Sequence, residues 1–397
     1  MKPLPVPSII VLLLAASLMS LLADPLPPPT NALVRIAAAQ PKARLIDWKI
    51  QDSDRVLAEI DQSLTELEAL VEKAAAQRCI AVAFPEDTLG LGNWLAGNPT
   101  QARALLGPAV ERMLARFQRA AARHRIFIVC CNNYAAADGT LRNTAFLVGR
   151  DGRELSRYHK VCPAIHERYC TPGNEFPVFD TADLGSVGLL ICYDMVFPEP
   201  ARCLALGGAD LIFHPTLGGA AIGDNDISRA AFRTRAVENF VYLVVAQRGS
   251  GSLIVSPKGA ILAEANGPDS LAIAEIDPFG GREGGDAMND QADMRARLFR
   301  ERSPAAFGIL TDPNPPVLAK VPATITEAEA VRIGNRVLTV GQEEFKAAEK
   351  LVQEGKTKEA LEAFARLRTE YRGSWIDRVA AERITNLQNA RHAVEPQ

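Results

Sequence analysis

The amino-acid sequence predicts an α/β protein in which helices cover large, mostly buried sheets. Short apolar runs of strand length alternate along the chain with longer stretches whose apolar residues recur at helical spacing. The strand-like runs are continuously apolar rather than alternating in polarity, which is typical of sheets that are covered on both faces. Some runs are joined by tight turns and others by helical stretches, so hairpins and crossover connections occur together in a layered arrangement.

The first series of expected elements lies between residues 34 and 160. It begins with a strand at 34–40, where VRIAAAQ stops at Pro41. A helix follows at 52–77, because apolar residues recur at helical spacing after the capping residues Asp52 and Ser53. The remaining expected elements of this series are a strand at 79–86, a helix at 100–124, a strand at 126–134 and a hairpin of 143–149 with 150–160 that turns at Asp151-Gly152.

The same alternation repeats between residues 186 and 277. Its expected elements are a strand at 186–194, a helix at 197–208, a strand at 209–216, a helix at 227–239, a strand at 241–248, a hairpin at 252–265 and a strand at 270–277. Strands that alternate with helices in this way favour layers of helix on sheet.

A different composition begins after the linker signal DPNPP at 312–316. The chain there is rich in Ala, Glu, Lys, Leu and Arg, and three helices are expected at 342–355, 356–371 and 374–392. Their layout resembles a tetratricopeptide-type hairpin with one following helix, whereas about three repeats are normally needed to bury a solenoid core. The extension is therefore expected to pack on the preceding region or on a partner, as a structural appendage or as a docking module.

The N-terminal residues predict an export signal. Lys2 precedes the almost wholly apolar run from Ser8 to Ala23, and the next charge is Asp24. A positive start, a short hydrophobic run and a small residue at its end are typical of a secretory signal peptide. The run is shorter than the roughly 20 residues that a bilayer-spanning helix needs. We expect a periplasmic or secreted protein, with an uncleaved membrane anchor as the alternative.

Charge and cysteine content exclude several classes of protein. The chain has 44 Lys and Arg against 47 Asp and Glu, a net charge of −3, and no basic stripe, so no nucleic-acid partner is expected. Seven cysteines are an odd number, which leaves at least one thiol unpaired. Cys162 and Cys170 flank a loop and are candidates to pair in an oxidising compartment. No Cys or His spacing is typical of a zinc site, so neither a metal nor a cofactor is expected.

Three reactive side chains stand at the ends of apolar runs, where active sites of layered α/β folds gather. They are Glu86 in AVAFPEDTLG, Lys160 in SRYHKVCPAIHERYC and Cys192 in VGLLICYDMVF. Each alone has an ordinary explanation as a solvated turn residue, a surface charge or a buried apolar thiol. Together they suit nucleophilic catalysis, because a thiol of ordinary pKa near about 8.5 needs a base or a positive neighbour at neutral pH.

These segments resemble the nitrilase (carbon–nitrogen hydrolase) superfamily, whose triad is Glu, Lys and Cys in this chain order. The resemblance covers residues 33 to 310 and includes YCTPGNEFPVFDT, CYDMVFPEPAR, RTRAVEN and GSLIVSPKGAILAE. It implies a four-layer αββα sandwich of the nitrilase type, here followed by the small helical extension. Members of the superfamily commonly assemble across a dimer interface, so a homodimer or larger homo-oligomer is expected.

The resemblance also implies roles for further residues. Glu167 lies seven residues after Lys160, where amidase-like and carbamoylase-like members place a second glutamate that orients the lysine and the substrate nitrogen. An exposed loop charge is the ordinary alternative for Glu167. The backbone N–H of Tyr193 and the Lys160 ammonium are the expected oxyanion donors. His214 is a candidate substrate-lining residue, with a hydrogen-bonded structural histidine as the alternative.

The sequence therefore predicts a cysteine-dependent hydrolase that cleaves a non-peptide C–N bond of a small amide or N-carbamoyl amine and releases ammonia. Cys192 attacks the substrate carbon to give a thioester, and Glu86 moves the proton in both half-reactions. Nitrile hydrolysis and acyl transfer on the same fold are alternatives. A non-enzymatic scaffold that docks partners through the C-terminal helices is the alternative of a different class.

The expected organisation divides the chain into five parts: a signal peptide at 1–23, a Pro-rich linker at 24–32, a catalytic domain at 33–312, a linker at 313–340 and a helical extension at 341–397.

Overall fold

A computed structural model describes residues 33–42, 46, 50–164, 167, 169–218, 225–280, 294–321, 326, 328, 329, 342–370 and 375–392. The expected signal peptide at 1–23 and Pro-rich linker at 24–32 lie outside these residues, as does much of the expected linker at 313–340. Within the described part of the chain, no helix is both long and apolar enough to cross a membrane.

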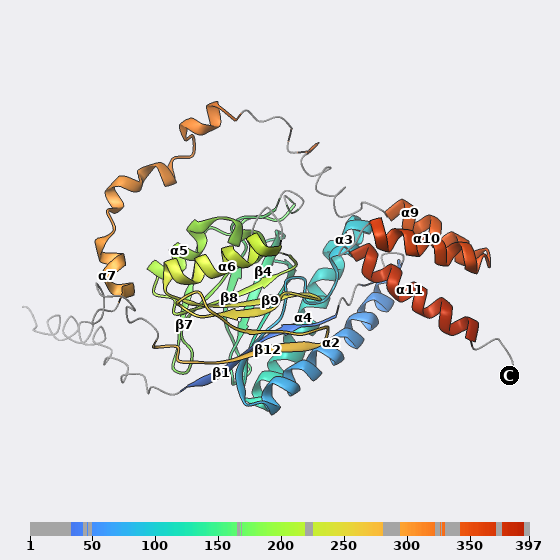
Figure 1. Ribbon diagram of the computed structural model, residues 1–397, viewed down its shortest axis with the longest axis horizontal. Helices are drawn as coiled ribbons and strands as arrows, with labels where there is room; N and C mark the ends of the chain where they lie inside the picture. Colours follow the sequence, from blue (N-terminus) through green and yellow to red (C-terminus); the bar gives the residue numbers. More distant parts are fainter. Residues whose placement is uncertain are drawn as a thin grey trace, which may run out of the picture. The chain divides into compact units, whose positions relative to one another are not determined.

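Two six-stranded sheets form the centre of the fold (Figure 1). The first has the order β12-β1-β2-β3-β4-β5 and consists of β12 (Ser270–Ile276), β1 (Val34–Gln40), β2 (Cys79–Ala83), β3 (Phe127–Ala135), β4 (Leu141–Val148) and β5 (Glu154–His159). The second has the order β11-β10-β9-β8-β7-β6 and consists of β11 (Ile261–Glu264), β10 (Leu253–Val255), β9 (Tyr242–Gln247), β8 (Leu211–Thr216), β7 (Gly185–Leu189) and β6 (Val178–Thr181).

Both sheets are mixed in the same way. Three parallel strands lie at the centre of each sheet, β1-β2-β3 in one and β9-β8-β7 in the other, and every other neighbouring pair of strands is antiparallel. Parallel strands need crossover helices, and antiparallel ones are joined by short turns. The combination of hairpins and crossovers that the sequence predicts is therefore confirmed.

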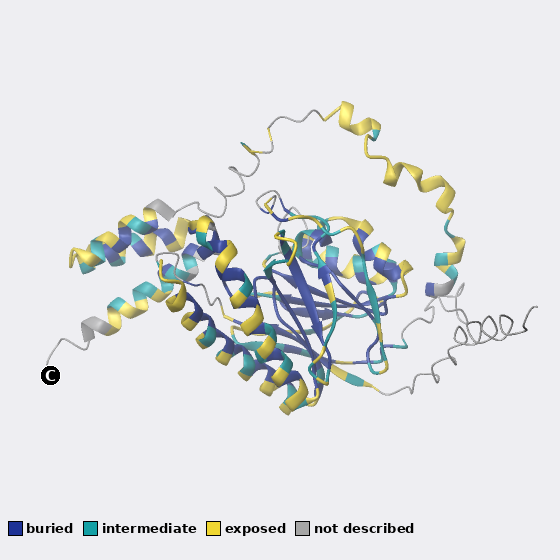
Figure 2. Cartoon of the chain, turned by 180° about the vertical axis from the view of Figure 1, so that it is seen from behind, coloured by how far each residue is buried: buried dark blue, intermediate teal, exposed yellow. Residues whose placement is uncertain are grey.

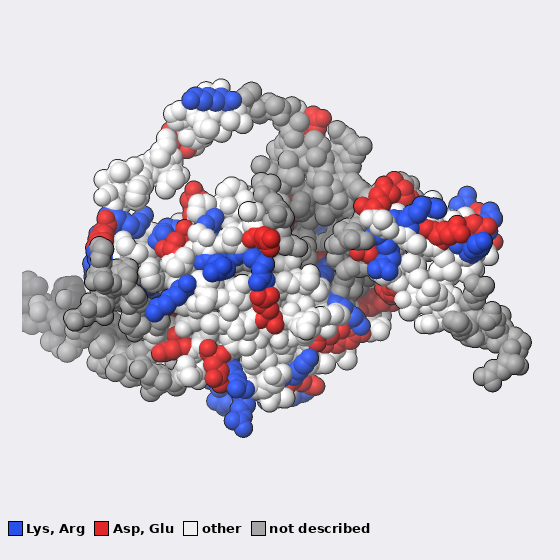
Figure 3. Space-filling view, in the orientation of Figure 1, with Lys and Arg blue, Asp and Glu red and all other residues white. Residues whose placement is uncertain are grey.

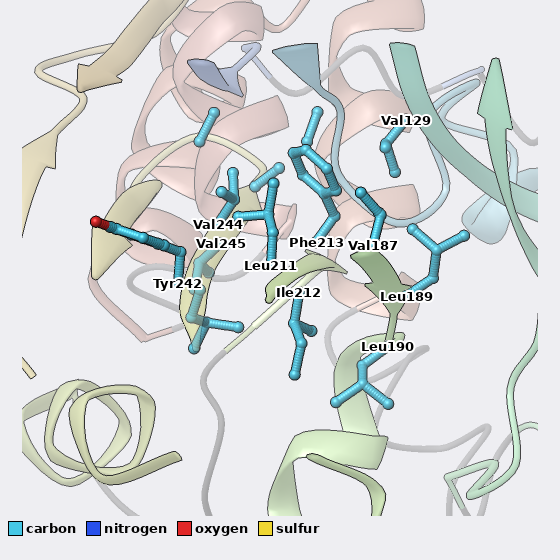
Figure 4. Close-up of a cluster of buried hydrophobic side chains, with 14 of the residues drawn as sticks. Val129, Val187, Leu189, Leu190, Leu211, Ile212, Phe213, Tyr242, Val244 and Val245 are labelled. Carbon is cyan, nitrogen blue, oxygen red and sulfur yellow. The ribbon is translucent and has the colours of Figure 1, made fainter. Parts of the chain in front are cut away.

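Helices cover the outer face of each sheet. The long helices α2 (Ser53–Ala76) and α4 (Pro99–His124) pack on the first sheet, and α5 (Pro198–Leu206) and α6 (Asn225–Asn239) lie over the second. The two sheets face one another across an apolar layer, in which Val129 of β3 approaches side chains of β7 and β8 (Figure 4). The predicted four-layer αββα arrangement is confirmed, and Figure 2 shows buried strands beneath helices that are exposed only on their outer sides.

The helix α2 illustrates why local sequence determines these elements. Asp52 accepts a hydrogen bond from the N–H of Asp54 and caps the first turn, as its position predicts. Buried apolar residues then recur every three or four positions and face the sheet; they include Val56, Ile60 and Leu64.

On the face shown in Figure 3, Lys and Arg side chains lie among Asp and Glu side chains.

Several local features differ from the sequence-based expectation, among them β6 (Val178–Thr181), where no strand was expected. The strand expected at 186–194 ends at Leu189, and a 3-10 helix, η3 (Cys192–Val196), follows it. A short helix that was not expected, α3 (Gly92–Gly97), precedes α4. η3 has five residues and α3 has six, and helices this short are not detected by hydrophobic periodicity alone.

All seven cysteines are free, so the candidate pairing of Cys162 with Cys170 is wrong. The Sγ of Cys170 is buried and faces Oδ1 of Asn133 at 3.8 Å. Cys162 is held by its backbone N–H, which donates to Asp194 at 2.8 Å. The two residues therefore have different polar neighbours, although they lie eight positions apart in the sequence.

The described part of the chain beyond the sheets contains further helices. These are α7 (Met294–Glu301), the 3-10 helices η4 (Pro304–Thr311) and η5 (Pro316–Ala319), and three C-terminal helices, α9 (Gln342–Gln353), α10 (Thr357–Glu370) and α11 (Trp375–His392). Arg295 of α7 forms a buried ion pair with Asp210 at 2.5 Å. The C-terminal helices pack around their own core, which includes Phe345, Phe364 and Ile376. Their likeness to a tetratricopeptide hairpin remains a prediction.

Candidate active site

The candidate residues lie just beyond strand ends. Glu86 follows β2 after Pro85, Lys160 directly follows β5, and Cys192 begins η3 after β7. β2 and β7 belong to the parallel centres of the two facing sheets, so their carboxyl ends bring polar groups to the edge of the sandwich.

A buried lysine joins two carboxylates. The Nζ of Lys160 donates to Oε1 of Glu86 at 2.9 Å and to Oε2 of Glu167 at 2.6 Å. The three side chains are 2%, 5% and 8% exposed. Asn143 completes the group, because its Nδ2 donates to Oε1 of both glutamates at 2.7 Å. The sequence allowed Glu167 to be either a site residue or an exposed loop charge, and the structure shows that it is a buried partner of Lys160.

The charges of this group stabilise one another. Burial by itself lowers the pKa of Lys160, but the carboxylates of Glu86 and Glu167 outweigh it and hold that pKa well above its ordinary value. For Glu167, burial acts to raise the pKa, but the Lys160 ammonium and the hydrogen bonds from Lys160, Ala164 and Asn143 lower it below its ordinary value. Both groups are therefore ionised at neutral pH.

Cys192 occupies a sharp turn beside this charged group. Its φ of 43° lies in the left-handed region, which side chains other than glycine adopt at a cost. Burial of the sulfur and the negative charge of Glu86 raise the pKa of Cys192 to about 12, against the opposing effect of Lys160 and a hydrogen bond with Thr216. A raised pKa favours the neutral thiol of Cys192, so a base would have to remove its proton before the sulfur could act as a nucleophile.

Asp194 connects the Cys192 turn to the segment after Lys160. Its carboxylate accepts hydrogen bonds from the N–H of Ile191 at 2.9 Å and of Cys162 at 2.8 Å, and from the hydroxyl of Tyr158 at 2.8 Å. Burial raises the pKa of Asp194 to about 6. Because Ile191 directly precedes Cys192 and Cys162 follows Lys160 by two positions, the carboxylate of Asp194 fixes these two segments relative to each other.

A second ion pair fixes the turn that carries Glu86. Asp87 also has a positive φ, of 50°, and its carboxylate accepts from the N–H groups of Leu91 and Gly92 at 2.8 and 3.0 Å. Arg248, at the end of β9, donates to the same carboxylate at 3.0 Å and to the carbonyl oxygen of Asp87. The turn is therefore held both by backbone groups that follow it directly and by Arg248, which lies 161 positions away in the sequence.

The TPG segment approaches the Lys160 backbone closely. The N–H of Gly173 donates to the carbonyl oxygen of Lys160 at 2.9 Å. A Cβ on Gly173 would lie 2.2 Å from the carbonyl oxygen of His159, which is closer than Cβ atoms in proteins approach another atom. Only glycine permits this contact.

The side chains of the other two predicted residues, Tyr193 and His214, take no part in the hydrogen bonds that join Lys160, Asn143 and the two glutamates. Tyr193 is partly exposed, and its ring meets that of Phe197 edge to face at a centroid distance of 5.6 Å. His214 is wholly buried near the end of β8, with its ring 5.7 Å from that of Phe232, and burial lowers its pKa to about 3. In the described ranges, no cluster of three or more His, Cys, Asp or Glu side chains is arranged to hold a metal ion.

Sequence reasoning missed three residues of this site: Asn143, Asp194 and Arg248. Asn143 is the one amide side chain in the buried strand β4. A polar side chain in a buried strand could have marked it as a site residue, as the polar residues at strand ends did for Glu86, Lys160 and Cys192. Arg248 similarly follows the apolar β9. Asp194 follows Cys192 by two positions but carried no pattern of its own.

Comparison with known proteins identifies related chains. A family model described as carbon–nitrogen hydrolase matches residues 35–282. Deaminated glutathione amidase of Synechocystis sp. (strain PCC 6803 / GT-S) is 32% identical over 245 residues, which are 55% of this chain and 87% of that protein. The omega-amidase of Saccharomyces cerevisiae is 31% identical over 156 residues, or 34% of this chain and 53% of that protein.

Solved structures of one bacterial amidase share the fold. An amidase from Nesterenkonia sp. superposes with a TM-score of 0.51 at 25% identity, covering 68% of this chain and 97% of that one. A mutant of the Nesterenkonia sp. AN1 amidase gives a TM-score of 0.54 at 23% identity, covering 72% and 99%. The latter structure carries the acetamide moiety of fluoroacetamide covalently added at its active-site cysteine.

Proposed function

The chain belongs to the carbon–nitrogen hydrolase family, and on this premise we propose that it hydrolyses a small amide or N-carbamoyl amine through a thioester on Cys192. The observation that carries the proposal is the buried Lys160 between Glu86 and Glu167, beside a thiol on a strained turn. Amidases among the relatives support an amide as the substrate class.

The first half-reaction forms the thioester. The Cys192 proton moves to Glu86 as the sulfur attacks the carbonyl carbon, so that an S–C bond forms and the C=O bond becomes a C–O⁻ single bond. The Lys160 ammonium and the N–H of Tyr193 stabilise this oxyanion. When the C–N bond breaks, Glu86 returns the proton to the leaving nitrogen, and ammonia departs from a primary amide.

The second half-reaction releases the acid. Glu86 removes a proton from water, and the resulting oxygen nucleophile attacks the thioester carbon. Collapse of the second tetrahedral intermediate breaks the C–S bond, and the sulfur recovers its proton from Glu86. Because Cys192 has a raised pKa of about 12, reprotonation of the thiolate is favourable and restores the resting state.

Ammonia release from a panel of linear amides, N-carbamoyl amines and nitriles tests the reaction and the substrate class together. We expect turnover of amides or N-carbamoyl amines, its complete loss in Cys192→Ala, and a covalent adduct on Cys192 in the mass spectrum of the trapped enzyme. Cys203→Ala is the matched control, because Cys203 is exposed on α5 and should be dispensable. Activity that survives in Cys192→Ala would refute the mechanism.

The same panel separates the alternatives on this fold. Preference for nitriles would identify a nitrilase-type substrate. Slow acid formation without an added amine, together with fast formation of a new amide when an amine acceptor is added, would identify acyl transfer. No turnover of any substrate by a folded protein would favour the scaffold alternative.

We also propose that the chain forms a homodimer or larger homo-oligomer through the outer face of α5 and α6. Leu206 and Val237 on these helices are 44% and 40% exposed, whereas α2 and α4 expose no large hydrophobic side chain among their described residues. Apolar residues exposed on one face favour association there. Sedimentation of wild type and of Val237→Glu tests this, since the charge should dissociate the assembly.

The C-terminal helices are proposed to dock a protein partner. They have a separate core, so their folding does not draw on residues of the two large apolar clusters. Deletion of 317–397 with unchanged turnover and loss of a partner complex would support docking, whereas loss of solubility or oligomerisation would identify a structural appendage.

Export through cleavage of residues 1–23 remains our proposal for localisation. Cell fractionation and N-terminal sequencing of the mature protein test it. Recovery mainly from the cytosol with residues 1–23 retained would overturn it, and recovery from membranes with those residues retained would identify an anchor.

A further inference from the structure

Asn143 occupies the centre of the lysine–carboxylate group. It lies in β4 directly opposite Asn133 of β3 and is 4% exposed. Its carbonyl oxygen accepts a hydrogen bond from the N–H of Lys160 at 2.9 Å, so its main chain also fixes the backbone from which the lysine extends.

The surroundings determine which way its amide points. The Sγ of Cys131 donates to Oδ1 of Asn143 at 3.3 Å, and Nδ2 lies 2.7 Å from one oxygen of each glutamate. The reverse orientation would place an amide oxygen at 2.7 Å from two carboxylate oxygens, which repel it. Both hydrogens of Nδ2 are therefore used, one for each carboxylate.

The two glutamates are left with different capacity to accept a proton. Both oxygens of Glu167 are occupied, Oε1 by Asn143 and Oε2 by Lys160 and the N–H of Ala164. Glu86 instead receives Lys160 and Asn143 at the same oxygen, Oε1. No described residue donates a hydrogen bond to Oε2 of Glu86, so this oxygen is the open acceptor of the group.

We propose that Asn143 is a positioning residue that directs the Cys192 proton to Oε2 of Glu86 and keeps Glu167 ionised throughout the reaction. The inference rests on the proposed function. In the transfer step the S–H bond of Cys192 breaks and an O–H bond forms at Oε2, while Lys160 and Asn143 stay on Oε1. Without the amide, Glu86 is free to rotate its carboxylate, and both carboxylates lose a hydrogen bond that favours the charged form.

The test compares Asn143→Ala and Asn143→Asp with Asn133→Ala. Asn133 is the matched control, because it lies opposite on β3 and its Nδ2 donates to Tyr169 rather than to a glutamate. Loss of a charge-assisted hydrogen bond raises a carboxyl pKa by about one unit. We therefore expect the acid limb of the pH profile of kcat/KM to move up by about one pH unit in Asn143→Ala and further in Asn143→Asp, with about a tenfold fall in kcat and little change in KM.

A reduced kcat with an unmoved acid limb in both variants would show a merely structural effect and overturn the inference, as would behaviour equal to that of Asn133→Ala. Asn143→Asp adds a third carboxylate next to Glu86 and Glu167, so if that variant does not fold, Asn143→Ala, which adds no charge, carries the test alone.

A readout without substrate separates this inference from the proposed function. The lowered pKa of Glu167 gives stability that is present at neutral pH and lost as the pH falls. Asn143→Ala reduces that contribution, so its urea midpoint should lie furthest below wild type near about pH 7 and approach it only as the pH falls below about 4, through the lowered pKa of Glu167. A difference that does not depend on pH would refute the role of Asn143 even if amides are hydrolysed. If no amide is hydrolysed but the difference narrows, the proposed function fails while the effect on the carboxylates stands.

Discussion

Replacement of Lys160 by Met would leave two buried carboxylates without their cation. The substitution keeps the length of the side chain and removes the ammonium that contacts Glu86 and Glu167 at 2.9 and 2.6 Å. Breaking a buried ion pair by removing one partner costs about 3–5 kcal/mol, because the remaining charge is desolvated and unpaired. Here the loss falls on two carboxylates that also share the hydrogen-bond donor Asn143, so we expect a cost at the upper end, about 5 kcal/mol, while both are ionised.

Uptake of a proton by one carboxylate relieves this cost and makes it depend on pH. The pKa of that carboxyl in the folded variant then lies above its unfolded value of about 4.3. The folded variant therefore binds more protons than the unfolded chain above that pH, and its stability falls as the pH rises, by up to about 1.4 kcal/mol per pH unit until the raised pKa is passed.

Urea unfolding at about pH 8 and about pH 5 measures the effect, and the free-energy loss caused by Lys160→Met should be larger at the higher pH. Lys42→Met is the matched control, since Lys42 pairs with Glu66 at 3.0 Å with its side chain 51% exposed, and exposed pairs contribute about 0–1 kcal/mol. The double variant Lys160→Met/Glu167→Gln should recover part of the loss. An equal loss at both pH values, or a loss no larger than that of Lys42→Met, would refute the reasoning.

Three further results are expected. Gly173→Ala should lower stability by about 1–3 kcal/mol and should also lower turnover, because its Cβ would lie 2.2 Å from the carbonyl oxygen of His159. Gly107→Ala in α4, whose Cβ meets no atom within 4 Å apart from its chain neighbours and the backbone of its own helix, should leave turnover unchanged. The raised pKa of Asp194 stabilises the folded protein at low pH, and wild type loses this contribution as the pH rises from about 4 to about 6. Asp194→Asn lacks the contribution, so the unfolding free energies of the two proteins should diverge by up to about 3 kcal/mol across that window. Parallel curves of unfolding free energy against pH would contradict this. Phe364→Ala should lower the unfolding free energy of the C-terminal helices by about 3–5 kcal/mol, measured by circular dichroism, and leave ammonia release unchanged. A parallel loss of activity would show that the core of the C-terminal helices is coupled to the core between the sheets.

Local signals in the sequence account for most of the elements. The helix expected at 52–77 is observed at Ser53–Ala76, because its cap and its apolar spacing are both encoded within the helix itself. The strand expected at 186–194 stops at Leu189, although Leu190 and Ile191 are as apolar and as buried as the strand before them. Polarity therefore could not reveal the end of that strand, which depends on the backbone turn at Cys192.

The residues that hold the site in place were harder to predict than the candidate reactive ones. Asn143 contacts Glu86 across 57 positions of sequence, and Arg248 contacts Asp87 across 161. No periodicity or spacing connects such distant positions, and only the pairing of strands brings them together. The reverse error occurred at Cys162 and Cys170, where closeness in sequence suggested a disulfide, whereas both cysteines are free in the structure.

The sequence by itself determined the layered α/β architecture, the separate composition of the C-terminal helices and the identity of the candidate reactive side chains. The architecture follows from local apolar periodicity, whereas the candidate reactive side chains were identified because their segments at strand ends resemble the nitrilase superfamily. Only the tertiary structure decided the protonation states of those side chains, the neutral thiol at Cys192 and the charged pair of Lys160 and Glu167. The reason is physical: a pKa depends on burial and on the charges that folding brings within a few ångströms, and neither is present in the unfolded chain.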